Sequence, residues 1–199
     1  MLDAALRPRL APAFDVAARS ADRAGVSPAM VTALGLVVGL GACVAAAFGA
    51  WWIALAALLG NRALDGLDGV LARRQETASD LGGFMDFLAD FVVYGGFVCG
   101  VAIAVPDARV ACVFLLAVYL LNNVALLSFS ALVEKRGLDH GDERSLRFTG
   151  GLTEGTETIV AYSAFCFWPA RAAVIAWVFG AMVAVTVVQR VALAVRELR

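Results

Sequence analysis

Apolar residues dominate the chain from residue 27 onward, in long stretches separated by short polar or turn-forming segments. A helix that crosses a membrane needs about 20 mostly apolar residues. Six stretches are long enough, at residues 29–49, 51–72, 81–105, 108–133, 152–169 and 171–194. Prolines, glycines or charged residues stand at the joints, where helices end and turn. The pattern predicts an all-α integral membrane protein with six transmembrane helices.

The first 26 residues show a different pattern, because charged residues interrupt the apolar stretches. We therefore expect no secretory signal, which needs a continuous apolar region. From Pro12 onward the apolar positions favour one side of a helix, with Phe14, Ala17, Ala18 and Ala21. The opposite side carries Asp15, Arg19, Asp22 and Arg23. Such a helix lies in the membrane interface rather than crossing it. We therefore expect an amphipathic interfacial helix in residues 1–26 and a six-helix transmembrane domain in residues 27–199.

Composition and charge agree with a membrane protein and exclude one class of partner. Hydrophobic residues make up 61% of the chain and its mean hydropathy is +0.82, whereas soluble domains contain about 45–50% apolar residues. The net charge of −1 gives no electrostatic reason to bind nucleic acid. With the N-terminus in the cytoplasm, only Arg109 and Arg171 of the 16 Lys and Arg residues fall outside, and Arg62 lies within a span. The positive-inside rule then places both termini on the cytoplasmic side of an inner membrane.

The second and third spans meet the cytoplasmic side in an unusually acidic window, NRALDGLDGVLARRQETASDLGGFMDFLAD, at residues 61–90. Asp65 and Asp68 share one helix face, and Asp86 and Asp90 share another, because residues three or four apart lie on the same side of a helix. At a rise of about 1.5 Å per residue, both pairs lie about 8–14 Å from the cytoplasmic ends of their helices. Consecutive antiparallel helices would thus present four carboxylates to one groove.

Four buried carboxylates need positive charge beside them. One ionised Asp at the centre of a bilayer costs about 2.5–3.5 kcal/mol on insertion scales, and four together also repel one another. Divalent cations such as Mg²⁺ favour carboxylate oxygens, and two ions bridged by shared carboxylates would fit four ligands. The alternative is that the four Asp residues form buried ion pairs with Arg62, Arg73 and Arg74.

The window resembles the signature of the CDP-alcohol phosphotransferases, D-x2-D-G-x2-A-R-x8-G-x3-D-x3-D. Every fixed position is present, at Asp65, Asp68, Gly69, Ala72, Arg73, Gly82, Asp86 and Asp90. The length, the six spans and the N-terminal interfacial helix match the family in outline. The segment GVSPAMVT at 25–32 also resembles the family's Pro-Asn-x-x-Thr opening, with Pro28 and Thr32 present but Ala29 in place of Asn.

The resemblance implies an activity and a set of roles. The family's enzymes transfer a substituted phosphate from a CDP-alcohol, here CDP-diacylglycerol, to an acceptor hydroxyl and release CMP. It implies a homodimer with a site for two divalent cations, Mg²⁺ or Mn²⁺, open to the cytoplasm. The implied metal ligands are Asp65, Asp68, Asp86 and Asp90, of which Asp90 is also the general base. The implied CDP-binding positions are Thr32, Gly69, Ala72, Arg73 and Gly82.

The acceptor remains open in the sequence, and the polar loop at residues 134–159 offers two possibilities. Lys135, Arg144 and Arg147 could hold a phosphorylated acceptor, such as glycerol phosphate or inositol phosphate, by charge-assisted hydrogen bonds. Glu154 and Glu157 could instead attract an amine such as serine or choline. Each set also has a structural explanation, since basic residues favour the cytoplasmic side and acidic residues favour helix N-termini.

A divalent-cation transporter is the rival function, because carboxylates inside a membrane also mark ion pathways. A transporter needs a polar route that continues to the far side of the membrane. The outer third of each predicted span is apolar. The sequence therefore favours the transferase.

Overall fold

The computed structural model describes residues 2–137 and 155–198, with side chains from residue 11 onward, and these residues form helices and no strand. The long helices are α1 (Leu2–Arg23), α2 (Pro28–Ala47), α3 (Trp51–Arg74), α4 (Asp80–Ala104), α5 (Arg109–Lys135), α6 (Gly155–Phe167) and α7 (Ala172–Glu197). Two short 3₁₀ turns, η1 (Pro106–Ala108) and η2 (Pro169–Arg171), precede α5 and α7. The all-α prediction is confirmed.

Capping side chains begin the two helices that flank α3. Ser27 accepts a hydrogen bond from the Met30 amide at 3.3 Å, and Pro28 occupies the first turn of α2, where its missing amide hydrogen costs nothing. Ser79 accepts from the Gly82 amide at 3.2 Å and begins α4. Such side chains satisfy amides that have no partner within the helix. The predicted starts of these spans, residues 29 and 81, each lie one residue inside the observed helix.

Two boundaries differ more from the expectations. The helix expected from Pro12 begins at Leu2, so α1 includes both Pro8 and Pro12. Each proline removes one amide donor from the helix, which weakens a helix without always ending it. At the other end, α6 has 13 residues and begins at Gly155, whereas the fifth span was expected from residue 152. Residues 152–154 lie outside the described part of the chain.

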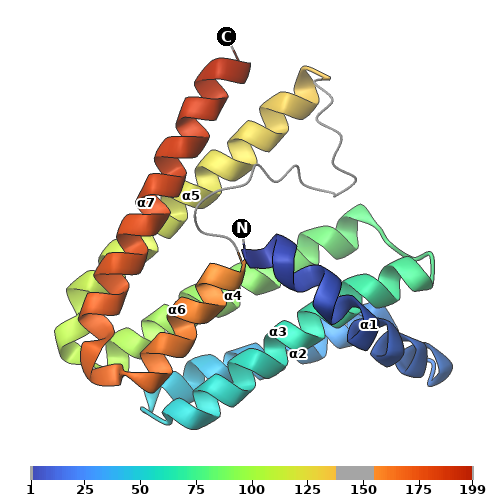
Figure 1. Cartoon of the computed structure of the whole chain (residues 1–199), viewed down its shortest axis with the longest axis horizontal. Helices are drawn as coiled ribbons and strands as arrows, with labels where there is room; N and C mark the ends of the chain where they lie inside the picture. The colour runs from blue at the N-terminus through green and yellow to red at the C-terminus, as the bar shows by residue number, and fades with distance from the viewer. Residues whose placement is uncertain (1, 138–154, 199) are drawn as a thin grey trace.

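The helices form two groups that diverge like the arms of a V (Figure 1). In one arm α2 packs mainly against α3 and α4, with α1 against α3, and in the other α5 packs against α7. The short turns η1 and η2 lie near the vertex, where the arms join. Tyr162 of α6 is fully buried there and its hydroxyl donates to the Tyr94 carbonyl of α4 at 2.9 Å. It also lies 3.3 Å from the hydroxyl of Tyr119 on α5, so α6 links both arms.

Close approach of α2 and α4 depends on glycine. A Cβ at Gly100 of α4 would lie 2.6 Å from the Cys43 carbonyl oxygen and 3.1 Å from the Ala46 Cβ, both on α2. Small residues at such crossings allow the backbones of lipid-embedded helices to pack directly. The Gly96-x-x-x-Gly100 spacing is therefore structural.

We expect Gly100→Ala to destabilise the protein by about 1–3 kcal/mol, because the added methyl meets backbone that cannot move aside alone. Gly95→Ala is the matched control on the same helix, since its Cβ would meet nothing within 4 Å. Thermal unfolding in detergent measures both. Equal unfolding temperatures for the two variants would contradict the proposed close contact.

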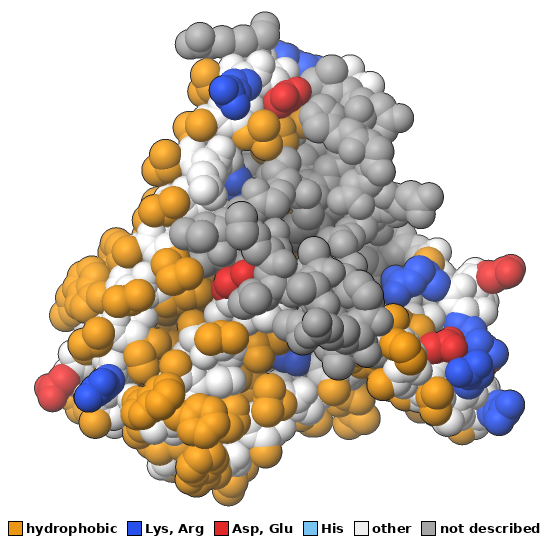
Figure 2. Space-filling view, in the orientation of Figure 1, with side chains coloured by type: hydrophobic (Ala, Val, Ile, Leu, Met, Phe, Trp, Pro, Cys, Tyr) orange, Lys and Arg blue, Asp and Glu red, His pale blue; other side chains and the backbone are white. Residues whose placement is uncertain are grey.

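Four helical segments of the described chain are long and apolar enough to cross a membrane by themselves: Pro28–Ala47, Asp80–Ala104, Pro106–Lys135 and Pro169–Glu197. The segments expected to be the second and fifth spans, α3 and α6, are not among them. α3 contains Arg62, Asp65 and Asp68 among its apolar residues, and α6 is too short. Hydrophobic side chains cover the vertex side of the face in Figure 2, while charged side chains gather over α1 and the free ends of α5 and α7.

Candidate functional site

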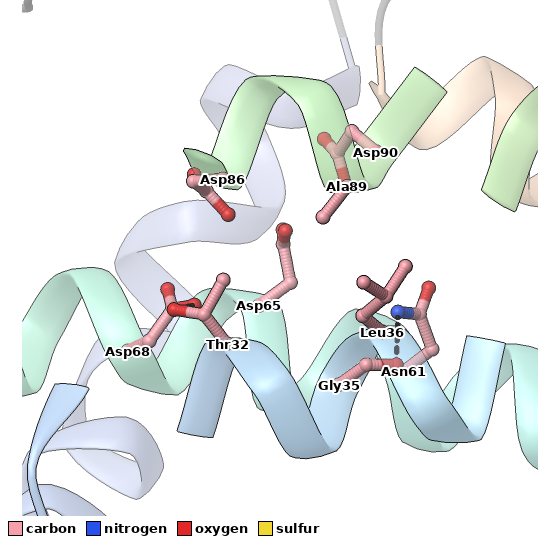
Figure 3. A pocket seen from close by; sticks show the side chains of 9 residues that line it. All are labelled: Thr32, Gly35, Leu36, Asn61, Asp65, Asp68, Asp86, Ala89 and Asp90. Atoms are coloured by element: carbon pink, nitrogen blue, oxygen red, sulfur yellow. Dashed lines mark hydrogen bonds between the residues drawn. The ribbon is translucent and has the colours of Figure 1, made fainter. Parts of the chain in front are cut away.

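A small pocket lies where α2, α3 and α4 meet, with about 200 Å³ of empty space including its open mouth. Its lining is mostly polar or acidic and comprises Thr32, Gly35, Leu36, Asn61, Asp65, Asp68, Asp86, Ala89 and Asp90 (Figure 3). All four carboxylates that the sequence placed on facing helix stripes therefore line one pocket. The grouping follows from the spacing of three or four residues on each of two antiparallel helices.

Asp65 is the central one of the four acidic side chains. Its side chain points from α3 toward α4 and lies between those of Asp86 and Asp90 (Figure 3). Asp68, one turn farther along α3, is only 5% exposed. Among the described residues, no three His, Cys, Asp or Glu side chains form a metal site as they stand. The four carboxylates share a pocket but are not grouped around one point.

Thr32 also lines this pocket between α2, α3 and α4, which we name the acidic groove for its four aspartates. Its hydroxyl donates to Asp68 Oδ2 at 2.6 Å and lies 3.1 Å from the Pro28 carbonyl oxygen. The resemblance implied that Thr32 contacts the nucleotide. In the structure its hydroxyl instead forms a hydrogen bond with Asp68, one of the motif carboxylates. Residues that orient a metal ligand typically change metal affinity or activity by about 10–100-fold when they are replaced.

We expect Thr32→Val to weaken Mn²⁺ binding about tenfold, because Asp68 loses the donor that fixes one of its oxygens. Calorimetric titration of the detergent-solubilised protein measures the dissociation constant. Thr77→Val is the matched control, at an exposed threonine in the turn between α3 and α4. An unchanged dissociation constant in Thr32→Val would show that Asp68 does not depend on this bond.

Arg62 is the one of the three arginines near the motif that pairs with its carboxylates among the described residues. Its side chain is only 10% exposed and pairs with Asp90 Oδ1 at 2.6 Å and with Asp65 Oδ2 at 3.6 Å. The alternative of arginine–aspartate ion pairs thus holds for one arginine and two carboxylates. The helical spacing from Arg62 to Asp65 was visible in the sequence, but the contact with Asp90, 28 residues away, was not.

The other two arginines of the window lie elsewhere. Arg74 pairs with Asp22 at 3.2 Å and with Asp15 at 3.9 Å, and both partners are on α1. Arg73 is exposed, and its guanidinium folds back toward Gly69 of the preceding turn. Neither arginine replaces a cation beside the four carboxylates.

Apart from Thr32, the expected nucleotide-binding positions lie in the second half of α3 and at the start of α4. A Cβ at Gly69 would lie 3.5 Å from Arg73 Nη1, an ordinary contact distance. The protein itself therefore does not require a glycine there, and the space is available to a ligand. Ala72 lies in the last turn of α3, and Gly82 lies in the first turn of α4.

The structure describes two of the five expected acceptor residues. Arg144, Arg147 and Glu154 lie outside the described residues. Lys135 is the exposed last residue of α5, and Glu157 lies in the first turn of α6. Neither lines the pocket between α2, α3 and α4.

Beyond the pocket, the residues that follow Asp90 on one face of α4 are apolar. Val93, Phe97 and Val101 follow Asp90 along α4 at successive turns, and all three are fully buried. They belong to a continuous hydrophobic core. The polar route that a cation transporter needs does not continue past Asp90 along this helix.

The charges of the pocket suit divalent cations. Four carboxylates and the Arg62 guanidinium leave a formal charge of −3 in a small, mostly desolvated space. Two divalent ions would reverse that sign and leave the site attractive to a diphosphate. Oxygen donors alone are also the set that Mg²⁺ and Mn²⁺ prefer. The residue types present therefore fit hard divalent cations.

Comparison with known proteins gives consistent matches over most of the chain. A family model described as CDP-alcohol phosphatidyltransferase matches residues 25–194. The inner membrane protein YnjF of Escherichia coli K12 is 39% identical over 194 residues, covering 96% of this chain and 94% of that protein.

Solved structures share the fold. The phosphatidylinositol phosphate synthase PgsA1 of Mycobacterium tuberculosis with CDP-DAG bound has a TM-score of 0.73 at 22% identity, covering 91% of this chain and 92% of that chain. The same enzyme with manganese and citrate also has a TM-score of 0.73, at 21% identity and with coverage of 91% and 88%. At these identities the likeness establishes the fold.

Proposed function

The chain belongs to the CDP-alcohol phosphatidyltransferase family, and from this membership we propose that it transfers a phosphatidyl group from CDP-diacylglycerol to a small polar alcohol in phospholipid synthesis. One observation carries the proposal. The four aspartates of the family's motif line a single pocket between α2, α3 and α4. Another CDP-alcohol with apolar tails would suit the same location, since its head would meet the acidic groove while its tails stay in lipid.

We assign two divalent cations, Mg²⁺ or Mn²⁺, to Asp65, Asp68, Asp86 and Asp90. The charge of the pocket supports this assignment, as does the manganese complex of the structurally similar PgsA1. When bound, such ions neutralise a diphosphate and stabilise the charge that develops on the leaving group.

The chain's own residues would bind and orient the substrate. Arg73 offers a planar fork of donors to the diphosphate, and Gly69 leaves room for close backbone approach. Thr32 orients Asp68, while Ala72 and Gly82 bound the nucleotide space.

Asp90 would take the proton of the acceptor hydroxyl as its oxygen attacks the phosphorus that carries the diacylglycerol. The bond between that phosphorus and the oxygen bridging to the CMP phosphate then breaks. CMP leaves with the electron pair of that bond, so the reaction needs no oxidant, reductant or further substrate.

The membrane arrangement is part of the proposal. Residues 27–199 would cross the inner membrane six times, with α3 and α6 as the two less apolar spans, and α1 would lie in the interface. Both termini and the mouth of the pocket would face the cytoplasm, where Lys and Arg gather. The E. coli relative is named an inner membrane protein. The assembly would be a homodimer.

The basic residues of the loop favour a phosphorylated alcohol as acceptor and its acidic residues favour an amino alcohol, and one assay distinguishes the two. Purified protein is supplied with Mn²⁺, CDP-diacylglycerol and, separately, glycerol 3-phosphate, inositol 1-phosphate, serine or choline. We expect CMP release only with one acceptor class. Arg144→Ala should raise the KM of a phosphorylated acceptor, and Glu157→Gln that of an amine. Absence of CMP release with every acceptor, from protein shown to bind Mn²⁺, would contradict the proposed function.

A further inference from the structure

Arg62 lies in a buried position that the proposed chemistry does not use. It stands on α3 within a proposed span, where a charged side chain is costly unless it has partners. Its partners come from two helices: Asn61 and Asp65 on α3, and Asp90 and Tyr94 on α4. An arginine so buried and so fully bonded is held in one orientation.

The contacts form a directed chain. Asn61 Nδ2 donates to the Gly35 carbonyl oxygen of α2 at 2.9 Å. Its side-chain oxygen is thereby turned toward Arg62 and accepts from Nε at 2.9 Å and from Nη2 at 2.7 Å. Two donors on one acceptor fix the plane of the guanidinium. Asn61 is itself only 3% exposed, so it is a rigid support.

The far side of the guanidinium is fixed as well. Nη1 donates to the Tyr94 hydroxyl at 2.9 Å, and the guanidinium carbon lies 5.0 Å from the centre of the Tyr94 ring. Nη2, already held by Asn61, donates to Asp90 Oδ1 at 2.6 Å. The orientation of Asp90 is thus determined through Arg62 by groups on α2, α3 and α4.

We infer that Arg62 is the positioning residue of Asp90, and that it holds this carboxylate in place at the cost of weaker cation binding. The inference rests on the proposed function, because it explains how that function's base is oriented. Arg62 raises the turnover number by fixing one oxygen of Asp90. Its fixed positive charge also repels the cations assigned to the same pocket, since the two interact across a poorly screened space.

The two effects have opposite signs, which separates positioning from simple structural support. Arg62→Gln keeps a hydrogen-bonding side chain but removes the charge and the fork. We expect kcat for CMP release to fall about 10–100-fold, with the KM for CDP-diacylglycerol within about threefold. We expect Mn²⁺ to bind about fivefold more tightly, because the repelling charge is gone. A residue that only supports the fold would lower turnover and metal affinity together.

Two further variants complete the experiment. Arg62→Lys keeps the charge but cannot reach Asn61, Tyr94 and Asp90 at once, so it should bind Mn²⁺ like the wild type and recover only part of kcat. Arg109→Gln, at an exposed arginine whose Nε donates to the Ala102 carbonyl oxygen, is the matched control and should behave as wild type. Thermal unfolding verifies that each variant is folded.

Mn²⁺ titration and CMP release test different claims. Arg62→Gln that binds Mn²⁺ no more tightly than wild type would overturn the inference, whatever the turnover. So would Arg62→Gln with a kcat within about twofold of wild type. A wild type that binds Mn²⁺ but releases no CMP would overturn the proposed function alone, and tighter Mn²⁺ binding in Arg62→Gln would then still support the effect of Arg62 on the carboxylates.

Discussion

Replacing Asp90 by Asn is expected to reduce CMP release about 10²–10⁴-fold, the range that a positioned general base contributes. The amide has nearly the shape of the carboxylate and its oxygen can still accept from Arg62, so the fold should persist. It cannot take the proton of the acceptor hydroxyl, and it brings no negative charge to a cation. Initial rates at saturating Mn²⁺ and CDP-diacylglycerol measure the loss.

Asp80→Asn is the control for this prediction. Asp80 is an exposed acidic residue in the first turn of the same helix and does not line the pocket. We expect its rate to stay within about twofold of wild type, as is usual for surface changes away from a site. If Asp90→Asn retained a comparable rate, Asp90 would have no part in the proton transfer.

Removing divalent cations is expected to abolish CMP release and to destabilise the protein. Without cations the four carboxylates face one another with Arg62 as their one positive partner among the described residues. A ligand present at 100 times its dissociation constant stabilises the folded state by about 2.7 kcal/mol. For a chain of this size that corresponds to about 5–10 °C in unfolding temperature. Chelation followed by readdition of Mn²⁺, monitored by activity and by thermal unfolding, tests both parts.

The control for the stability effect is the double variant Asp68→Asn with Asp86→Asn. It leaves Asp65 and Asp90 in place as partners of Arg62, so no buried charge is left unpaired. Its unfolding temperature should not respond to Mn²⁺. An equal response in the double variant would locate the bound cation outside the acidic groove.

The composition of the groove could be predicted from the sequence because it follows from local geometry. Asp65 and Asp68 are three residues apart and Asp86 and Asp90 are four apart, so each pair shares a face whatever the rest of the fold does. α2 packs against both α3 and α4, and this packing brings the two pairs to one pocket. Apolar length alone predicts α2, α4, α5 and α7.

Contacts between distant residues were not predictable in this way. Whether Arg62 would meet Asp90 depends on the rotation of α3 against α4, which periodicity does not specify. The same holds for Thr32 and Asp68, which belong to different helices. The divergence of α5 and α7 from the other helices also depends on tertiary packing at the vertex. α1 also continues through Pro8 and Pro12, although proline inside a helix usually kinks or ends it. The local rule therefore did not predict where this helix begins.

The polar residues of α3 bear on how the chain is inserted into the membrane. With Arg62 at its middle and two aspartates in its second half, α3 falls outside the segments apolar enough to cross a membrane alone. Each such charge disfavours passage from the translocon into lipid. The bonds from Asn61 to Gly35 and from Thr32 to Asp68 link α3 to the preceding helix. We therefore expect α2 to wait at the lateral gate until α3 has emerged from the ribosome, and the two to partition as a hairpin. Biogenesis of this protein then depends on the same side chains that would carry out its chemistry.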